Sequence, residues 1–222
     1  MEYSVVSSIY MLTFIKNLGG KGGLLDTLTP LLPEDFFTSK YRYIEPFLGG
    51  GALFLHLTTL DKSVAKRSIL NDFNKDIWNV WQQVKQFPDK IISGLEELKN
   101  THSKEQFLKI RASFVAYDQD KFNSAAAVNP TEYMDPESFR TSRAIRFIYL
   151  NKTCYNGLIR YNKSGWFNSP FGYYEHPQLV NESNLQLCST ALAKTKIHYE
   201  DFDQLFRFLS AAKQLDNKTF IY

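Results

Sequence analysis

The stretch Glu45-Pro46-Phe47-Leu48-Gly49-Gly50-Gly51 decides the fold of this 222-residue chain. It follows the β-prone run Tyr41-Arg42-Tyr43-Ile44, and residues 52–57 after it have the apolar spacing of a helix. A strand, a glycine-rich turn and a helix in this order are typical of a parallel α/β sheet. Glycines at such a turn let the backbone approach a ligand closely.

A second strand and helix follow the first pair. The run Ser68-Ile69-Leu70 ends at Asn71-Asp72-Phe73-Asn74, after which apolar residues recur at helical spacing from residue 77 to residue 84. Residues 75–122 are predicted to be mostly helical, residues 123–136 to form a loop, and a further helix to begin near Ser138.

The alternation resumes near the other end of the chain. Lys196-Ile197-His198-Tyr199 has the composition of a third strand and leads to Asp201-Phe202. A short helix around residues 204–213 and a last apolar strand, Thr219-Phe220-Ile221-Tyr222, come after it. We therefore predict an α/β fold with a Rossmann-like parallel sheet.

Candidate ligand groups stand at the predicted strand ends, where ligands bind in such sheets. Asp72 lies 21 residues after Gly51, a position from which an acid can accept hydrogen bonds from ribose hydroxyls. A dinucleotide fits less well, because Phe54 takes the place of the third small residue of that fingerprint. Asp201 could accept an adenine amino group and Phe202 could stack on the ring, although this pair is also typical of a helix N-cap followed by a core residue.

Residues 140–174 are the most basic part of the chain and contain no Asp or Glu. Cations can neutralise phosphates, amides and arginines can read base edges, and aromatic rings can stack on bases. This composition predicts a DNA-reading segment. The alternative is that Arg143 and Arg146 lie on a solvated helix face while aromatics such as Phe147 and Tyr149 fill a small core. The cations of the segment are Arg140, Arg143, Arg146, Lys152, Arg160 and Lys163.

The overall composition is that of an ordinary globular protein, with 44% hydrophobic and 22% charged residues. The net charge of +3 is too small to identify a nucleic-acid partner by itself.

Two cysteines indicate a reducing compartment, and four histidines without ligand spacing predict no metal site. We find no signal peptide or membrane span and expect a cytoplasmic protein. Whether residues 1–10 precede a natural start at Met11 stays open.

Six motifs in order resemble those of Dam-type DNA adenine-N6 methyltransferases from about residue 12 onward. They are Phe14-Ile15-Lys16-Asn17-Leu18-Gly19-Gly20-Lys21, the Glu45 to Gly51 stretch, Asn71-Asp72-Phe73-Asn74, Leu150-Asn151-Lys152-Thr153-Cys154-Tyr155-Asn156-Gly157-Leu158-Ile159-Arg160, Phe167-Asn168-Ser169-Pro170-Phe171-Gly172, and Asp201-Phe202. The resemblance implies S-adenosylmethionine as cofactor and double-stranded DNA with a flipped adenine as substrate.

The resemblance also implies roles for individual residues toward the cofactor. Asn17 and Lys21 would face its methionine end, and the loop with Glu45, Pro46, Phe47, Gly49 and Gly51 would wrap it. Asp72 would hold the ribose, and Asp201 with Phe202 would hold the adenine. These roles agree with those inferred from the chemistry of the strand ends.

Toward DNA, the segment from Tyr155 to Arg160 would enter a short target site, commonly GATC in the similar enzymes. Tyr155 would wedge beside the flipped adenine, and Asn156 and Leu158 would touch bases or a thymine methyl group. Arg160 would read a guanine, aided by Lys16 and Tyr174. We add Asn162 to this DNA-binding set because of its amide.

Two departures from the family pattern stand out. The first motif usually has Trp-Ala where this chain has Asn17-Leu18. The second is that the Asp-Pro-Pro-Tyr motif, expected after the strand at residues 219–222, is not in the sequence. Its acid and carbonyl would hold the target amino group and its aromatic ring would stack on the flipped base. We therefore name no catalytic residue in this chain and expect a sheet that is incomplete at its C-terminal side.

We expect residues 11–74 and 191–222 to form part of an S-adenosylmethionine-binding domain, and residues 75–190 a mainly helical target-recognition lobe. The 222 residues alone are expected to be inactive. Two alternatives stay open: a catalytically dead DNA-binding or regulatory protein, and one half of a split enzyme. The exposed strand at residues 219–222 would then be a surface for a partner chain or for self-association.

Overall fold

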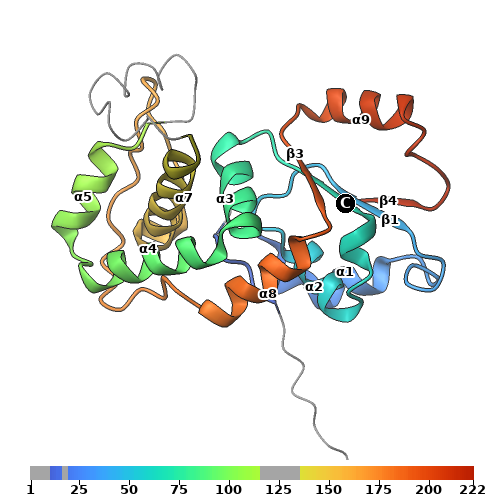
Figure 1. The fold of residues 1–222 in the computed structure, drawn as a ribbon, viewed down its shortest axis with the longest axis horizontal. Helices are drawn as coiled ribbons and strands as arrows, with labels where there is room; N and C mark the ends of the chain where they lie inside the picture. The colour runs from blue at the N-terminus through green and yellow to red at the C-terminus, as the bar shows by residue number, and fades with distance from the viewer. Residues whose placement is uncertain (1–10, 17–19, 116–135) are drawn as a thin grey trace, which may run out of the picture.

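The computed structural model describes residues 11–16, 20–115 and 136–222. In this part of the chain four strands form one parallel sheet, in the order β3-β2-β1-β4 (Figure 1). The strands are β1 (Arg42–Glu45), β2 (Ser68–Asn71), β3 (Lys196–His198) and β4 (Thr219–Ile221). All four predicted strands are present, and the predicted α/β class with a parallel sheet is confirmed.

The two faces of the sheet are covered by different helices because successive side chains of a strand point to opposite sides. Ile44 of β1 pairs with Ile69 of β2, and both are buried against α9 (Phe202–Ala211). Tyr43 and Leu70 point the other way into the main core. That core includes α2 (Ala52–Leu60) and α3 (Lys75–Gln86).

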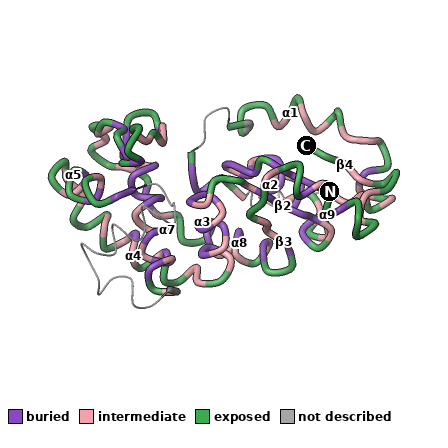
Figure 2. Tube along the Cα trace, turned by 90° about the horizontal axis from the view of Figure 1, so that it is seen from above, coloured by how far each residue is buried: buried purple, intermediate pink, exposed green. Residues whose placement is uncertain are grey.

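A group of helices forms the lobe beside the sheet. In Figures 1 and 2, α4, α5 and α7 lie at one end of the molecule and the sheet at the other. The helix predicted near Ser138 is α7, and most of the predicted loop at residues 123–136 lies outside the described residues. The lobe helices are α4 (Pro88–Asn100), α5 (Lys104–Ala112), α7 (Pro136–Thr153) and the short η5 (Tyr155–Gly157).

Several elements were not predicted from the sequence. They are α8 (Glu182–Leu192), the short helices η1 (Lys21–Leu24), α1 (Leu25–Leu28) and η2 (Thr29–Leu31), and η3 (Val64–Arg67) before β2. Each of the four short helices has only three or four residues, too few for an apolar period to show in the sequence. Within the described ranges, no helix is long and apolar enough to cross a membrane.

Helix α3 contacts both the sheet and the lobe. Asn74 caps its start by accepting hydrogen bonds from the backbone N–H groups of Asp76 and Ile77. On one side, Gln82 and Lys85 donate to backbone carbonyls at β3 and just before it. On the other side, α3 packs along α7. Helix α3 therefore connects the lobe to the sheet directly.

Candidate functional site

A cavity of about 680 Å³ opens at the carboxyl ends of β1 and β4. The chain runs from β1 to β2 and β3 on one side, and β4 then adds on the other side of β1. Ligands of open parallel sheets bind at the point where the strand order reverses in this way. Lys16, Glu45, Phe47, Gly51 and Tyr222 are among the residues that line the cavity.

The glycine loop after β1 is shaped by a tryptophan of α3. Gly49 and Gly51 have φ angles of 49° and 60°, a region that L side chains rarely adopt. A Cβ atom on Gly51 would lie 2.5 Å from the buried ring of Trp81. The indole N–H of Trp81 also donates to the Gly49 carbonyl at 2.9 Å. Trp81 thus fixes the loop that borders the cavity, a role that its position in a helical pattern did not reveal.

Asp72, the predicted ribose ligand, lies beside this loop. Its carboxylate accepts the backbone N–H of Gly49 at 2.7 Å and that of Asn74 at 2.8 Å. Burial raises the pKa of Asp72, whereas these two hydrogen bonds lower it. The carboxylate is therefore held in one orientation at the end of β2, next to the turn that follows β1.

A buried amide joins the ends of three strands. The Asn71 side chain donates to the Pro46 and Glu200 carbonyls, each at 3.0 Å, and accepts the Glu200 backbone N–H at 3.0 Å. Asn71 is fully buried. This contact brings the segment before Asp201 and Phe202 beside the glycine loop, and the sequence alone did not single out Asn71 for it.

Exposed aromatic rings gather at the same edge of the sheet. Phe47 and Phe202 are 70% and 50% exposed, and their ring centroids lie 5.8 Å apart. Asp201 is the N-cap of α9 and accepts the backbone N–H of Asp203 at 2.9 Å. The N-cap reading of Asp201 is thus correct, but Phe202 is not a core residue. Its exposed face is free to stack on a planar ligand.

A second aromatic pair stands at the ends of β2 and β3 and was missed in the sequence. Phe73 is 63% exposed and stacks on Tyr199, with ring centroids 6.0 Å apart and an interplanar angle of 9°. Phe73 directly follows Asp72 in the sequence. The sequence signal that could have identified this pair is the aromatic residue directly after the candidate ribose ligand.

Glu45 is the buried acid of the cavity. It is only 3% exposed, and the Tyr43 hydroxyl donates to its carboxylate at 2.7 Å. Burial raises the pKa of Glu45 to about 8, and the charge of Asp72 adds to the rise. Glu45 is therefore mostly protonated at neutral pH, and a cationic ligand in the cavity would favour its ionised form.

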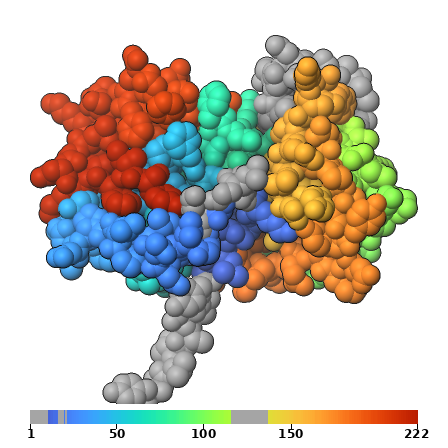
Figure 3. Space-filling view, turned by 180° about the vertical axis from the view of Figure 1, so that it is seen from behind, coloured from blue at the N-terminus to red at the C-terminus, as the bar shows by residue number. Residues whose placement is uncertain are grey.

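The predicted DNA-binding residues lie on the lobe, beside the N-terminal segment. Seen from behind in Figure 3, the blue N-terminal residues lie against the orange lobe. Buried Asn151 makes this junction: it accepts the Lys16 backbone N–H at 2.7 Å and donates to the carbonyls of Lys16 and Gly157. The Lys16 ammonium lies 4.8 Å from the ring centroid of Tyr174. Lys16 therefore borders both the cavity and the predicted DNA-reading face.

The remaining predicted DNA contacts differ in exposure. Tyr155, Asn156 and Arg160 are exposed, and Leu158 is half-buried. Asn162 is exposed as well, but its side-chain oxygen accepts the backbone N–H groups of Ser164 and Trp166. That oxygen shapes a turn and is already occupied.

Arg143 was predicted to lie either in a DNA-reading segment or on a solvated helix face, and both predictions were wrong. This residue is 8% exposed, so it lies neither on a solvated helix face nor on a DNA-reading surface. Its guanidinium pairs with buried Asp76, with an Nε to Oδ1 distance of 2.6 Å. The acid that neutralises it lies outside the acid-free segment, which is why composition could not show the pair. Phe147 and Tyr149 are core residues, as the alternative predicted.

Two predicted cofactor contacts cannot be placed. Asn17 lies outside the described residues, and so does the side chain of Lys21. The described ranges hold no group of three or more His, Cys, Asp or Glu residues that could bind a metal ion.

Comparison with known proteins identifies the family. Residues 18–216 match the family model of the D12 class of N6 adenine-specific DNA methyltransferases. The chain belongs to this family. The resemblance seen in the sequence motifs is therefore confirmed, and the parallel sheet with flanking helices agrees with the Rossmann-like fold of a methyltransferase.

Named relatives of this family member include enzymes from archaea and bacteria. The chain is 35% identical over 203 residues to the type II methyltransferase M.MjaIII of Methanocaldococcus jannaschii, covering 89% of this chain and 65% of that protein. It is 30% identical over 217 residues to the type II methyltransferase M1.LlaDCHI of Lactococcus lactis subsp. cremoris, covering 97% and 66%. A DNA adenine methylase of Serratia marcescens is 33% identical over 192 residues, covering 85% and 60%. The chain thus spans less than two thirds of the length of each.

The raised pKa of Glu45 predicts a pH-dependent stability. The folded carboxyl binds its proton more tightly than the unfolded one, so the free energy of unfolding should fall as pH rises from about 4.5 to about 8. One pKa unit corresponds to about 1.4 kcal/mol. Urea unfolding of wild type and of Glu45→Gln at pH 5 and pH 8 measures the change in the free energy of unfolding between the two pH values. The variant should lose less stability between the two pH values, and parallel losses in both proteins would show that Glu45 ionises normally.

Proposed function

We propose that this chain binds S-adenosylmethionine in the cavity at β1 and β4 and reads a short DNA site with its lobe, as part of a cytoplasmic adenine-N6 methyltransferase. The observation that carries the proposal is the position of Lys16. It lines the cavity and contacts Tyr174 of the lobe, so cofactor and DNA would meet at this residue. We also propose the domain division at residues 74/75 and 190/191.

The residues that line the cavity, together with Asp72 and Phe202 beside it, fit this cofactor. The glycine loop leaves the backbone open to a ligand, Asp72 can accept ribose hydroxyls, and Phe47 with Phe202 can enclose a purine ring. The Tyr222 hydroxyl is buried without a hydrogen-bond partner in the described part of the chain, which leaves it available to a ligand. When bound, S-adenosylmethionine supplies an electrophilic methyl group on a sulfonium ion. Glu45 would face that cationic end, while Lys21 and Asn17 are proposed on the strength of the family motif.

The lobe supplies groups that suit a duplex with one base turned out of the stack. Exposed Tyr155 can wedge into the gap beside a flipped adenine, and the half-buried Leu158 can touch a thymine methyl group. Arg160 presents a guanidinium that can pair with guanine in the major groove. We propose GATC as the first target to test because the similar enzymes commonly use it.

Asp72 provides the first test of cofactor binding. Replacing Asp72 with Asn removes the carboxylate charge and should weaken S-adenosylmethionine binding about tenfold or more, since a hydrogen bond to a charged group contributes roughly 1.5–3 kcal/mol. Titration calorimetry on the purified chain measures the dissociation constant. Asp203→Asn is the matched control, because Asp203 is an exposed acid on α9. Equal affinity of both variants would contradict the assigned role of Asp72.

Arg160 provides the test of DNA reading. Arg160→Ala should cost about 1–3 kcal/mol of discrimination between a GATC duplex and a duplex with one guanine replaced. Fluorescence anisotropy with both duplexes measures this. Lys163→Ala is the control: Lys163 is an exposed cation three residues away and should affect both duplexes equally. Unchanged discrimination in Arg160→Ala would exclude guanine reading by this residue.

We further propose that the 222-residue polypeptide binds both ligands without transferring the methyl group. Transfer needs the target nitrogen aligned behind the methyl group, and the Asp-Pro-Pro-Tyr motif that would align it is not in these residues. Tritium transfer from labelled S-adenosylmethionine to a GATC duplex should stay at background. A chimera with an Asp-Pro-Pro-Tyr segment after Tyr222 should transfer. Transfer by the polypeptide itself, or none by a folded chimera, would contradict this explanation.

The two alternatives predict different binding. A regulatory DNA-binding protein would bind the duplex whether or not the cofactor is present. One half of a split enzyme would need a second chain, and β4, an edge of the described sheet, is the proposed surface for that chain or for self-association. These two are secondary to the methyltransferase proposal, because the cavity and its ligand groups are built into the fold.

A further inference from the structure

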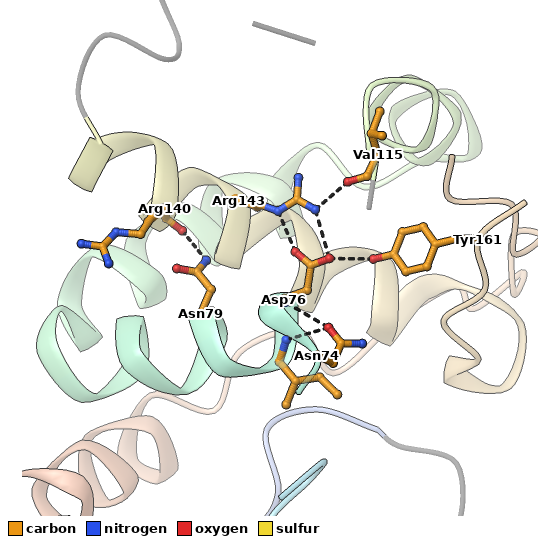
Figure 4. A network of polar contacts seen from close by, with 8 residues as sticks. Asn74, Asp76, Asn79, Val115, Arg140, Arg143 and Tyr161 are labelled. Atoms are coloured by element: carbon orange, nitrogen blue, oxygen red, sulfur yellow. Dashed lines mark hydrogen bonds and ion pairs between the residues drawn. The ribbon is translucent and has the colours of Figure 1, made fainter. Parts of the chain in front are cut away.

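The start of α3 connects the candidate ribose ligand to the interior of the lobe. Asp72 accepts the backbone N–H of Asn74, and the Asn74 side chain in turn accepts the backbone N–H of Asp76. Two residues beyond the cap, the Asp76 side chain points toward Arg143 of α7 (Figure 4). Two consecutive hydrogen bonds thus link Asp72 to the first turn of α3.

Asp76 is the centre of a buried polar cluster. It is 3% exposed and accepts hydrogen bonds from Arg143 Nε at 2.6 Å and Arg143 Nη2 at 3.0 Å. It also accepts the Tyr161 hydroxyl at 2.8 Å. Figure 4 shows the three side chains converging from α3, α7 and the lobe loop. A buried carboxylate with three donors has little freedom to move without breaking a contact.

Both ends of the lobe loop at residues 160–168 are attached to this cluster. On one side, Tyr161 directly follows Arg160, the proposed guanine reader. On the other side, Arg143 donates to the Val115 carbonyl at 2.6 Å, and Val115 bridges to Trp166. Tyr161 and Phe167 form a further antiparallel bridge, which closes the loop.

This loop begins with Arg160, and the other proposed base contacts, at residues 155–158, directly precede it. The Arg160 backbone N–H donates to the Ser169 hydroxyl at 3.2 Å, and its carbonyl accepts the Asn168 N–H at 2.9 Å. The backbone of Arg160 is therefore held by both of its polar groups, and the hydrogen bond from Tyr161 to Asp76 holds the next residue.

We propose that Asp76 and Tyr161 are positioning residues that couple cofactor binding to target reading. In this inference, which rests on the proposed function, cofactor contact with Asp72 stabilises the start of α3, and the Asp76–Tyr161 hydrogen bond passes that order to the loop carrying Arg160. Thermodynamic linkage then requires the reciprocal effect, so a bound target site tightens cofactor binding by the same factor.

The test measures this coupling factor in wild type and in Tyr161→Phe, which removes only the hydroxyl. Anisotropy gives the affinity for a GATC duplex with and without S-adenosylhomocysteine as an unreactive cofactor probe. In wild type we expect the probe to tighten binding roughly 5- to 150-fold, the usual range of coupling between sites. In Tyr161→Phe the factor should fall toward one, while the affinity for the probe alone changes little.

A matched control separates coupling from stability. Thr141 of α7 donates to Gln83 of α3 at 2.7 Å in the same buried helix contact, and its other hydrogen bond, to the Glu137 carbonyl, stays within α7. Thr141→Val should lower the free energy of unfolding and keep the full coupling factor. Asp76→Asn keeps the shape of the Asp76 side chain and should also lose the coupling. If Asp76→Asn does not fold, Tyr161→Phe still tests the loss of coupling.

Hydrogen exchange supplies a readout that does not need DNA. Adding S-adenosylhomocysteine alone should slow amide exchange in residues 158–168 of wild type and of Thr141→Val, but not of Tyr161→Phe. If wild type binds probe and duplex with coupling that Tyr161→Phe retains, the inference is overturned while the proposed function stands. If wild type binds neither ligand, the proposed function fails and the inference fails with it.

Discussion

The site depends on one buried amide, that of Asn71. Its hydrogen bonds to Pro46 and Glu200 join the ends of β1 and β3 to the end of β2, beside the backbone hydrogen bonds from the Leu48 N–H to the Asn71 carbonyl and from the Asp72 N–H to the His198 carbonyl. The glycine loop, Asp72 and the aromatic rings of Phe47 and Phe202 each follow one of these ends. Removing the amide would leave buried backbone groups unsatisfied and let the three ligand segments separate. The geometry of the cavity is therefore a consequence of pairing at the strand ends as much as of the glycines.

A second amide performs a similar task between the sheet and the lobe. Asn151 holds the backbone of Lys16 and of Gly157, so the segment that borders the cavity also lies against the face proposed to read DNA. Gly157 has a φ of 67°, and a Cβ there would lie 2.5 Å from the Lys16 side chain. The two surfaces that would meet a cofactor and a DNA duplex are thus in direct contact through a few fixed atoms.

Much of this arrangement could be predicted from the sequence because its signals are local. Each strand is a short β-prone run, and Asp72 follows the end of one such run at the position expected of a ribose ligand. The supporting contacts were not predictable, because their partners are far apart in the chain. Trp81 and Gly49 are separated by 32 positions, Arg143 and Asp76 by 67, and Asn71 and Glu200 by 129. Only the folded sheet brings these pairs together.

Helix α3 also limits how far the recognition lobe can be treated as a separate module. Its Trp81 supports the glycine loop, its Gln82 and Lys85 hold the end of the chain segment that enters β3, and its Asp76 neutralises Arg143 in the lobe. A lobe transplanted between relatives without its own α3 would bring an unneutralised arginine into the interior. A lobe transplanted together with α3 would place its Trp81 against the glycine loop of another protein, and the two would have to fit. Recognition and cofactor loops are therefore expected to be inherited together, and new target specificities to arise by changes at the tip of the loop rather than by exchange of whole lobes.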